Sequence, residues 1–252
     1  MGSLTGKKVF ITGAEQGIGK ETARKLIEAG CDIYIHYFSG EEGPRELIAI
    51  AQQRGGKAAC GYADLTNEAD AARCVAEGAA FLGGIDILVN NAGTIRRADA
   101  LTFSEKEWDD VLNLNLKSVF FLSQAVARQF IQQGDGGKIV NIASMLSFQG
   151  GIRVPSYTAS KSGVLGITRL LANEWAAKGI NVNAIAPGYM ATNNTQPLRE
   201  DEERNQAILE RIPAGRWGAP KDLQGPVVFL ASSAADYIHG YTLAVDGGWL
   251  AR

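Results

Sequence analysis

The 252-residue sequence predicts an α/β protein with a Rossmann-type, doubly wound parallel sheet of seven strands in the order 3-2-1-4-5-6-7. Three observations support this prediction. Short β-rich runs alternate with helical segments along the chain. Several of these runs are almost continuously apolar, as is typical of strands buried on both faces. The first run is followed by a glycine-rich turn and a helical segment, which is the order of the first unit of a dinucleotide-binding fold.

The expected strands are distributed over the whole chain. They span residues 9–12, 32–38, 58–62, 85–90, 138–143, 181–186 and 242–245. The clearest helical patterns cover residues 17–29, ending at Gly30, and residues 156–177. Ligands of such sheets bind beyond the carboxyl ends of the strands, where the strand order reverses. We therefore expect a site between the ends of the first and fourth strands.

The glycine-rich turn reads Thr12-Gly13-Ala14-Glu15-Gln16-Gly17-Ile18-Gly19. Glycines allow a tight turn and let backbone N–H groups approach a phosphate at a helix N-terminus. A turn of this kind also occurs as an ordinary strand–helix connection. Its position directly after the first strand favours the binding of a dinucleotide pyrophosphate.

A second group of residues indicates proton transfer. Tyr157 and Lys161 are four residues apart in a predicted helix and therefore share one face, and Ser144 follows the fifth strand. A free phenol has a pKa of about 10, and a neighbouring ammonium lowers it. By itself, the spacing also fits a Tyr and a Lys on an exposed helix face. Together with the glycine turn, it predicts a nicotinamide-dependent alcohol dehydrogenase or carbonyl reductase.

Composition narrows the alternatives. No linker rich in proline or serine divides residues 1–252, so we expect a single domain. A net charge of −2 provides no electrostatic attraction to nucleic acid or to an anionic membrane. No apolar run is long enough to span a bilayer, and the first strand leaves no room for a signal peptide, so we expect a cytoplasmic protein. The three cysteines lack metal-ligand spacing, and no metal site is predicted.

One segment interrupts the alternation of strands and helices. Residues 189–217 are long, polar and charged, and they follow the sixth strand on its ligand-binding side. Long insertions at this position are often lids. A solvated helical excursion without a gating role is the alternative, and we predict the lid.

Six motifs occur in one order: TGxxxGIG, Asn90-Asn91-Ala92-Gly93, Asn115, Ser144, YxxxK and Pro187-Gly188. From Thr5 to Trp249 the chain resembles the classical short-chain dehydrogenase/reductase family. The resemblance implies that Tyr157 is the acid/base and that Ser144 holds the substrate oxygen. It also implies that Lys161 lowers the phenol pKa and binds the nicotinamide ribose. Asn115 would hold a water that links Lys161 to solvent.

The same resemblance implies a set of cofactor contacts. They are Gly13, Glu15, Gln16, Gly17, Ile18, Gly19, Tyr37, Phe38, Asp64, Leu65, Asn91, Ala92, Gly93, Tyr157, Lys161, Pro187, Gly188, Met190 and Thr192.

The choice of cofactor depends on the end of the second strand. NAD enzymes often carry an acid there, and NADP enzymes carry a basic residue nearby. The run Ile35-His36-Tyr37-Phe38-Ser39 has neither. Glu15 and Gln16 stand where NADP enzymes often carry a basic residue, and Glu41 and Glu42 add negative charge. We therefore predict a preference for NAD(H) over NADP(H).

Arginines near the catalytic motifs indicate an acidic substrate, because guanidinium groups bind carboxylates bidentately. Any one of these arginines could instead be an ordinary surface residue. The predicted substrate contacts are Arg153, Gln149, Arg96 and Arg216.

Three segments resemble one branch of the family, namely residues 144–157, 186–195 and 211–218. Members of that branch act on keto and hydroxy sugar acids of the 2-dehydro-3-deoxy-D-gluconate type in uronate catabolism, as in pectin breakdown. An alternative is NADH-dependent reduction of 4-deoxy-L-erythro-5-hexoseulose uronate, from alginate, to 2-keto-3-deoxygluconate. A 3-oxoacyl reductase and a non-enzymatic nucleotide sensor remain further alternatives. Family members are commonly homotetramers, so we expect one here.

Overall fold

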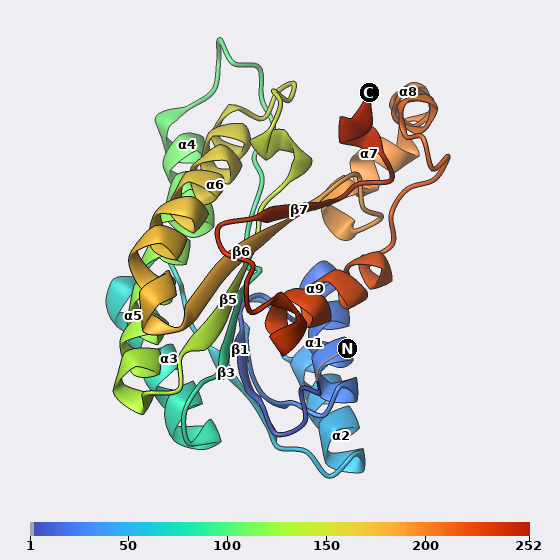
Figure 1. Cartoon of the computed structure of the whole chain (residues 1–252). Helices are drawn as coiled ribbons and strands as arrows, with labels where there is room; N and C mark the ends of the chain where they lie inside the picture. The colour runs from blue at the N-terminus through green and yellow to red at the C-terminus, as the bar shows by residue number, and fades with distance from the viewer. Residues whose placement is uncertain (1–2) are drawn as a thin grey trace.

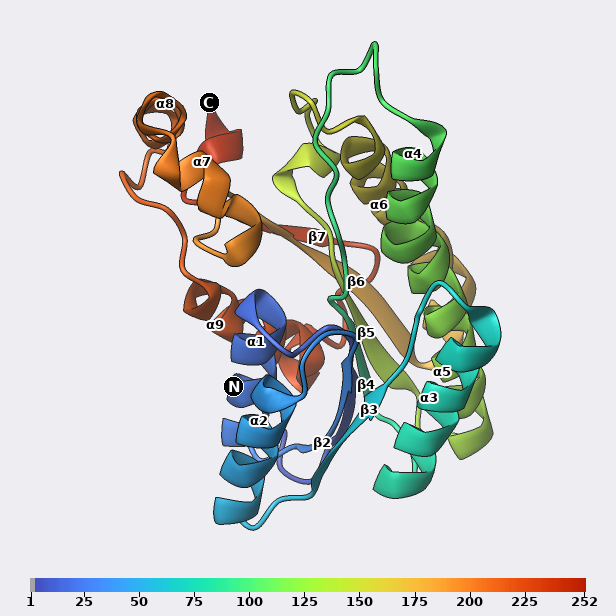
Figure 2. The ribbon, with the colours of Figure 1, turned by 180° about the vertical axis from the view of Figure 1, so that it is seen from behind.

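The computed structural model describes residues 3–252, which form a seven-stranded sheet with helices on both faces (Figures 1 and 2). The strand order is β3-β2-β1-β4-β5-β6-β7, and all neighbouring strands are parallel. The fold class and strand order predicted from the sequence are thereby confirmed.

The strands agree with the predicted ranges to within two residues at each end. They are β1 (Lys8–Ile11), β2 (Asp32–Tyr37), β3 (Ala58–Tyr62), β4 (Ile87–Asn90), β5 (Gly137–Ile142), β6 (Ile180–Pro187) and β7 (Thr242–Val245). The helices are α1 (Gly17–Glu28), α2 (Glu42–Gln53), α3 (Glu68–Leu82), α4 (Glu105–Leu112), α5 (Ser118–Gln133), α6 (Pro155–Trp175), α7 (Gln196–Glu200), α8 (Glu202–Arg211) and α9 (Gln224–Ala231).

The two faces of the sheet have separate cores. Helices α1, α2 and α9 cover one face, and α3 to α6 cover the other (Figures 1 and 2). In β1, Val9 and Ile11 pack with Leu26 of α1, whereas Phe10 packs with Phe130 of α5 on the opposite face. Because side chains alternate along a strand, a strand covered on both faces must be apolar at every position.

The segment between β6 and α9 leaves the sheet and returns to it, and backbone hydrogen bonds join its two ends. Ala191 N–H donates to the Gly218 carbonyl at 2.7 Å, and Gly218 N–H donates to the Tyr189 carbonyl at 2.9 Å. Beyond this neck, α7 and α8 lie past the ends of β6 and β7, near the C-terminus (Figure 1). The predicted lid at 189–217 therefore adjoins the ligand-binding edge of the sheet, and its movement stays a prediction.

Residues 3–252 contain no helix long and apolar enough to cross a membrane. Within the same residues, no group of three or more His, Cys, Asp or Glu side chains is placed to hold a metal ion.

Candidate active site

A cavity of about 1130 Å³ opens at the carboxyl ends of the strands. Its walls come from the glycine turn, the loop after β4, the end of β5, the start of α6 and the segment after β6. Most of the predicted site residues line it: Gly13, Glu15, Gln16, Gly17, Ile18, Gly19, Phe38, Asp64, Leu65, Asn91, Ala92, Gly93, Arg96, Ser144, Gln149, Arg153, Tyr157, Lys161, Pro187, Gly188, Met190 and Thr192.

Three predicted residues are not part of the lining. The ring of Tyr37 packs edge-on against Tyr62, with centroids 6.1 Å apart. Asn115 is fully buried beneath the cavity wall. Arg216 is turned away to Asp222, whose carboxylate oxygens lie 2.7 and 3.2 Å from its guanidinium nitrogens. The substrate contact predicted for Arg216 therefore has no support from its position, because the ion pair holds the side chain outside the cavity.

The glycine turn packs closely against the loop after β4. Gly13 has a φ of +63°, and a Cβ atom there would lie 2.8 Å from the Cα of Ala92. Asn91 Nδ2 donates to the carbonyls of Gly13 at 2.7 Å and Thr12 at 3.0 Å. A larger residue at position 13 would push these two walls apart. The turn thus has the narrow, backbone-lined form that suits close approach of a phosphate.

His36 is a contact that the sequence analysis did not assign. The Gly13 N–H donates to its Nδ1 at 3.2 Å, and its Nε2 lies 2.9 Å from the Ala63 carbonyl. Burial lowers the pKa of His36, so the ring is neutral, with Nδ1 accepting and Nε2–H donating. His36 thereby ties the glycine turn to the ends of β2 and β3. A histidine in an apolar strand gave no signal of this role.

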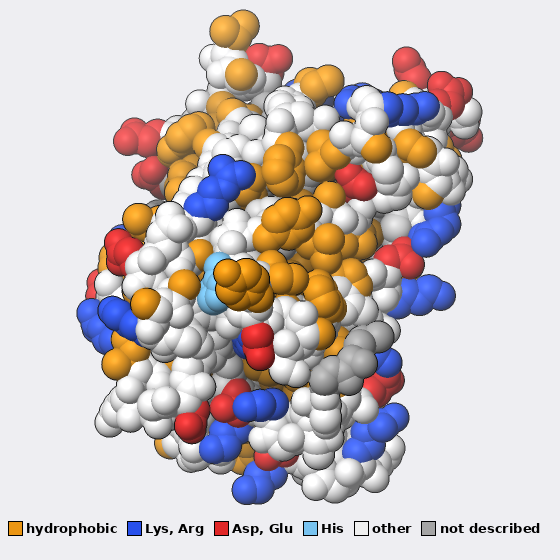
Figure 3. Space-filling view, viewed as in Figure 1, with side chains coloured by type: hydrophobic (Ala, Val, Ile, Leu, Met, Phe, Trp, Pro, Cys, Tyr) orange, Lys and Arg blue, Asp and Glu red, His pale blue; other side chains and the backbone are white. Residues whose placement is uncertain are grey.

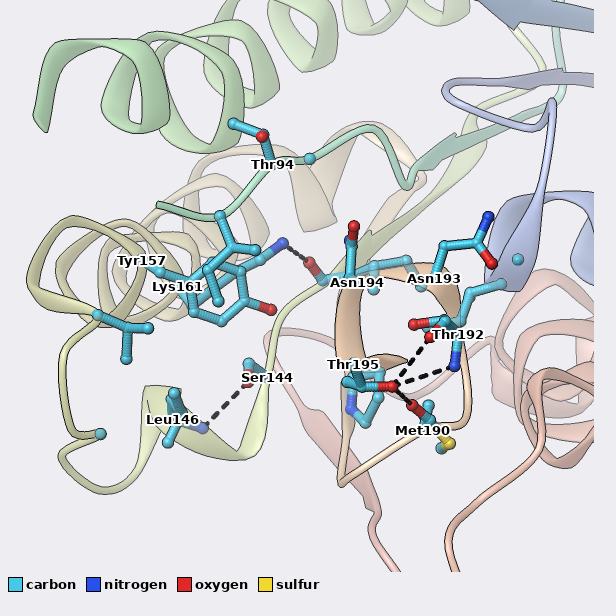
Figure 4. Close-up of a pocket in the computed structure, with 18 of the residues that line it drawn as sticks. Thr94, Ser144, Leu146, Tyr157, Lys161, Met190, Thr192, Asn193, Asn194 and Thr195 are labelled. Carbon is cyan, nitrogen blue, oxygen red and sulfur yellow. Dashed lines mark hydrogen bonds between the residues drawn. The ribbon is translucent and has the colours of Figure 1, made fainter. Parts of the chain in front are cut away.

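Ser144 and Tyr157 lie on one side of the pocket, facing Thr192, Asn193 and Asn194 (Figure 4). The Ser144 oxygen accepts a hydrogen bond from the Leu146 N–H at 3.1 Å, which holds the hydroxyl in place. Burial raises the pKa of Tyr157, while the Ser144 hydroxyl and the positive charge of Arg97 oppose that rise. The phenol is therefore protonated at neutral pH and can donate its proton.

Lys161 stands one helical turn after Tyr157. Its Nζ donates to the Ile142 carbonyl at 2.6 Å and lies 5.8 Å from the centroid of the Tyr157 ring. Burial lowers the pKa of Lys161 to about 8. The pKa of the Tyr157 phenol is raised in this geometry, and its predicted lowering by the ammonium stays a prediction. The physical reason is that burial of the phenol outweighs the opposing contacts, and the ammonium is held at a backbone carbonyl.

Asn115 sits in a π-helical segment, Asn113–Lys117, between α4 and α5. Its Oδ1 accepts from the Thr94 N–H, and its Nδ2 donates to the Thr94 carbonyl, both at 2.8 Å. Nδ2 also lies 3.3 Å from Ser160 Oγ. The side chain thus fastens the loop after β4 to α6, and π-helical turns are frequent at functional sites. Its role in holding a water stays a prediction.

Two neighbouring arginines differ in their freedom to bind a ligand. Arg96 is turned to Asp110 at 3.5 Å and to Thr94 Oγ1 at 2.8 Å. Arg97 lines the cavity, donates to the Asn194 carbonyl at 2.8 Å, and pairs with no carboxylate among residues 3–252. Its positive charge acts on the hydroxyls of Tyr157 and Tyr189. Arg97 is therefore a cavity-lining guanidinium near the Tyr157 hydroxyl that no carboxylate of residues 3–252 neutralises.

The predicted substrate residues Arg153 and Gln149 lie farther along the same wall. Arg153 is exposed and has a left-handed backbone with a φ of +61°, and its carbonyl accepts from the Ala98 N–H at 3.2 Å. Gln149 Oε1 accepts from Arg211 at 3.3 Å, and Arg211 stacks over the Trp249 ring at 4.1 Å. The contacts of Arg153 and Gln149 with substrate stay predictions.

A short turn at residues 193–195 is part of the cavity lining. Asn193 Nδ2 donates to Gln16 Oε1 at 2.7 Å, and the Asn194 carbonyl accepts from Arg97. The turn therefore connects the glycine turn, where a dinucleotide phosphate would lie, to the wall that carries the free arginine.

Sequence comparison identifies the class of protein that this fold and site define. A family model described as enoyl-(acyl carrier protein) reductase matches residues 13–250, and the chain belongs to the short-chain dehydrogenase/reductase family.

Two curated relatives and one solved structure match almost the whole chain. The chain is 64% identical over 251 residues to a 2-dehydro-3-deoxy-D-gluconate 5-dehydrogenase of Dickeya dadantii, covering 99% of this chain and 98% of that protein. It is 63% identical to the Escherichia coli enzyme of the same name, with the same coverage. A solved structure from Agrobacterium tumefaciens, with bound NADP, is provisionally named a 2-deoxy-D-gluconate 3-dehydrogenase. It is 54% identical, has a TM-score of 0.90, and covers 99% of this chain and 98% of that one.

The buried ammonium of Lys161 predicts a pH-dependent contribution to stability. Its pKa is about 8 in the folded protein and 10.5 in its ordinary state. Between these values the unfolded chain binds more protons, so this group makes the protein more stable as the pH rises. Below pH 8 the buried charge lowers the free energy of unfolding by about 3 kcal/mol. Lys161→Met removes the charge and therefore this loss of stability. Denaturant unfolding should show the mutant's advantage over wild type shrinking by about that amount between pH 7 and 10. A difference independent of pH would contradict the assignment.

Proposed function

We propose that the protein is an NAD(H)-dependent oxidoreductase that interconverts the carbonyl and alcohol of a sugar acid of the 2-dehydro-3-deoxy-D-gluconate type in uronate catabolism. One observation carries the proposal: the same cavity holds the glycine turn, the Ser144–Tyr157–Lys161 group and the free guanidinium of Arg97. The names and the 63–64% identity of the relatives support the substrate class.

The proposed chemistry assigns a separate task to each side chain. The bound nicotinamide supplies or accepts the hydride. In the direction of reduction, the Tyr157 hydroxyl donates its proton to the substrate oxygen, and the Ser144 hydroxyl donates a hydrogen bond to the same oxygen. The raised pKa of Tyr157 keeps that proton available at neutral pH. Once the proton has moved, the Lys161 ammonium favours the phenolate that remains.

The walls of the cavity fit a dinucleotide. The glycine turn and the N-terminus of α1 would hold the pyrophosphate, and Lys161 would bind the nicotinamide ribose. Pro187 to Thr192 would contact the carboxamide, and Asp64 and Leu65 would contact the adenine. All of these residues except Thr12, Ala14 and Ala191 line the cavity.

We propose NAD(H) as the preferred form, although the Agrobacterium relative contains NADP. The glycine turn presents Glu15 and Gln16, and Phe38 lies beyond the end of β2. Among residues 3–252 no lysine or arginine lines this end of the cavity, and His36 there is neutral. The nearby Arg45 is exposed and paired with Glu41 at 2.8 Å. A 2′-phosphate would therefore meet a carboxylate and find no free cation.

The sequence also predicted three alternative functions. Reduction of 4-deoxy-L-erythro-5-hexoseulose uronate would use the same groups, because that compound is also a keto acid with a carboxylate. Neither a 3-oxoacyl reductase nor a non-enzymatic nucleotide sensor would need a guanidinium that binds a sugar-acid carboxylate, which is the role proposed for Arg97.

The proposed role of Tyr157 predicts a sharp loss of turnover. Tyr157→Phe removes the transferred proton and little of the cavity wall, so kcat should fall at least a hundredfold while NADH binding changes little. Stopped-flow turnover and NADH fluorescence titration measure the two quantities. The assay uses keto-uronates, 4-deoxy-L-erythro-5-hexoseulose uronate and an acyl-carrier ketone as alternative substrates. A mutant that retains a tenth of wild-type kcat would exclude Tyr157 as the acid/base.

The two candidate carboxylate ligands can be separated by matched substitutions. A charge-assisted hydrogen bond is worth about 1.5–3 kcal/mol. Arg97→Gln should therefore lower kcat/KM for sugar acids by one to two decades, and it should spare a neutral carbonyl substrate. Arg153→Gln tests the residue predicted from the sequence under the same conditions. If only Arg153→Gln lowers kcat/KM for acidic substrates and spares the neutral one, the substrate carboxylate binds at the exposed loop and not beside Tyr157.

We propose a homotetramer, as commonly found in the family, with exposed apolar surface as its support. Figure 3 shows apolar side chains gathered over the middle of the face that contains β7 in Figure 1. Tyr241, directly before this edge strand, is 58% exposed, and on α5 and α6 Ile131 and Leu170 are 51% and 48% exposed. Surfaces of this kind commonly mark protein contacts. Light scattering should give a mass four times the 26.9 kDa of one chain. A monomeric mass would refute the proposal.

A further inference from the structure

The glycine turn carries a carboxylate to the end of β2. Glu15 lines the cavity, and its Oε1 accepts a hydrogen bond from Ser39 Oγ at 3.3 Å. Ser39 lies two residues after the last residue of β2, Tyr37. Glu15 thus comes from one strand–helix turn, and its charge lies beside the next.

The backbone around Glu15 is held from two sides. The Ala14 N–H donates to the His36 carbonyl at 3.2 Å. Gly43, in the first turn of α2, lies so close to the Glu15 carbonyl that a Cβ atom there would overlap with it. Helices α1 and α2 lie side by side behind this contact (Figure 2). The position of the carboxylate is therefore set by packing and does not depend on the Ser39 contact alone.

The second carboxylate oxygen lacks a partner. Glu15 Oε2 is buried and makes no hydrogen bond within residues 3–252, and no Lys or Arg of these residues forms an ion pair with Glu15. A buried acceptor without a donor is costly, and native proteins rarely leave one. Glu15 as a whole lines the cavity, so a ligand hydroxyl bound beside the carboxylate would supply the missing donor once the side chain turns this oxygen toward the cavity.

We infer that Glu15 accepts a hydrogen bond from the 2′-hydroxyl of the adenosine ribose of NAD(H). This inference rests on the proposed function for the cofactor and its orientation. In the usual dinucleotide-binding arrangement, an acid at the end of the second strand binds this hydroxyl. Here β2 ends in Tyr37, followed by Phe38, and the glycine turn supplies the acid instead. In this arrangement Glu15 strengthens the binding of NAD(H), in addition to repelling the 2′-phosphate of NADP(H).

Repulsion and recognition make different predictions for a cofactor that lacks the 2′-hydroxyl. If Glu15 only repels phosphate, NADH and 2′-deoxy-NADH should bind equally well. If Glu15 accepts the hydroxyl, wild type should bind 2′-deoxy-NADH roughly tenfold to a hundredfold more weakly than NADH, as expected for a hydrogen bond to a charged group.

The experiment measures dissociation constants by fluorescence titration or calorimetry for NADH, 2′-deoxy-NADH and NADPH, with no sugar acid present. Glu15→Ala and Glu15→Gln are compared with wild type. Glu15→Ala should weaken NADH by the same factor as removal of the hydroxyl, and should no longer distinguish NADH from 2′-deoxy-NADH. Both variants should bind NADPH more tightly than wild type does. Circular dichroism confirms that each variant is folded.

Glu42→Gln is the matched control. Glu42 is an exposed acid at the start of α2 and is not part of the cavity lining, so its loss removes a nearby charge without removing the contact. It should retain the wild-type discrimination between NADH and 2′-deoxy-NADH.

Two results would overturn the inference: equal binding of NADH and 2′-deoxy-NADH by wild type, or undiminished discrimination by Glu15→Ala. Because no substrate is present, an error in the proposed sugar acid leaves the result unaffected. Failure of wild type to bind any dinucleotide would instead refute the proposed cofactor, and the inference with it.

Discussion

The contact between the glycine turn and the loop after β4 determines the geometry of the whole site. Thr12 Oγ1 accepts hydrogen bonds from the backbone N–H groups of Asn91 and Ala92, each at 3.0 Å. Asn91 Nδ2 in turn donates to the carbonyls of Thr12 and Gly13. These bonds join β1 to β4 at the point where the strand order reverses. The same loop continues to Thr94, which Asn115 fastens to α6 through Ser160. The cofactor wall and the catalytic wall are thus parts of one hydrogen-bonded unit.

Burial shifts the pKa of each member of the proposed catalytic pair, Tyr157 and Lys161. It raises the pKa of Tyr157 and lowers that of Lys161, so that each side chain is shifted toward its neutral form. Near neutral pH Lys161 still carries its charge, and the Ile142 carbonyl accepts from it without neutralising it. Within residues 3–252 this ammonium pairs with no carboxylate, so in the proposed reaction it would stabilise negative charge that develops on the phenol oxygen.

The sequence predicted the elements whose pattern is local. Continuous apolar strands such as Ile180–Pro187 and the i,i+4 pair on α6 were recognisable without tertiary information. Contacts between distant residues were not. Arg216 was a predicted substrate contact, but it pairs with Asp222, six residues later. Arg97, which was not among the predicted contacts, donates to the Asn194 carbonyl, 97 residues away. His36 and the π-helical turn at Asn115 depend on neighbours that only folding brings together.

The cavity is electrically asymmetric, and this asymmetry unites the two proposed specificities. Glu15 lies at the end nearest β2, where it suits an uncharged ribose that carries hydroxyl donors. Arg97 lies at the catalytic end, near the hydroxyls of Tyr157 and Tyr189, where it suits a carboxylate. The turn at Asn193 and Asn194 contacts both ends, through Gln16 next to Glu15 and through Arg97 itself. In the proposed function, an anionic substrate would be drawn to the end where hydride and proton are transferred, and a phosphate on the ribose 2′-oxygen would be opposed at the other end. One distribution of charge can therefore select both the sugar acid and the form of the cofactor.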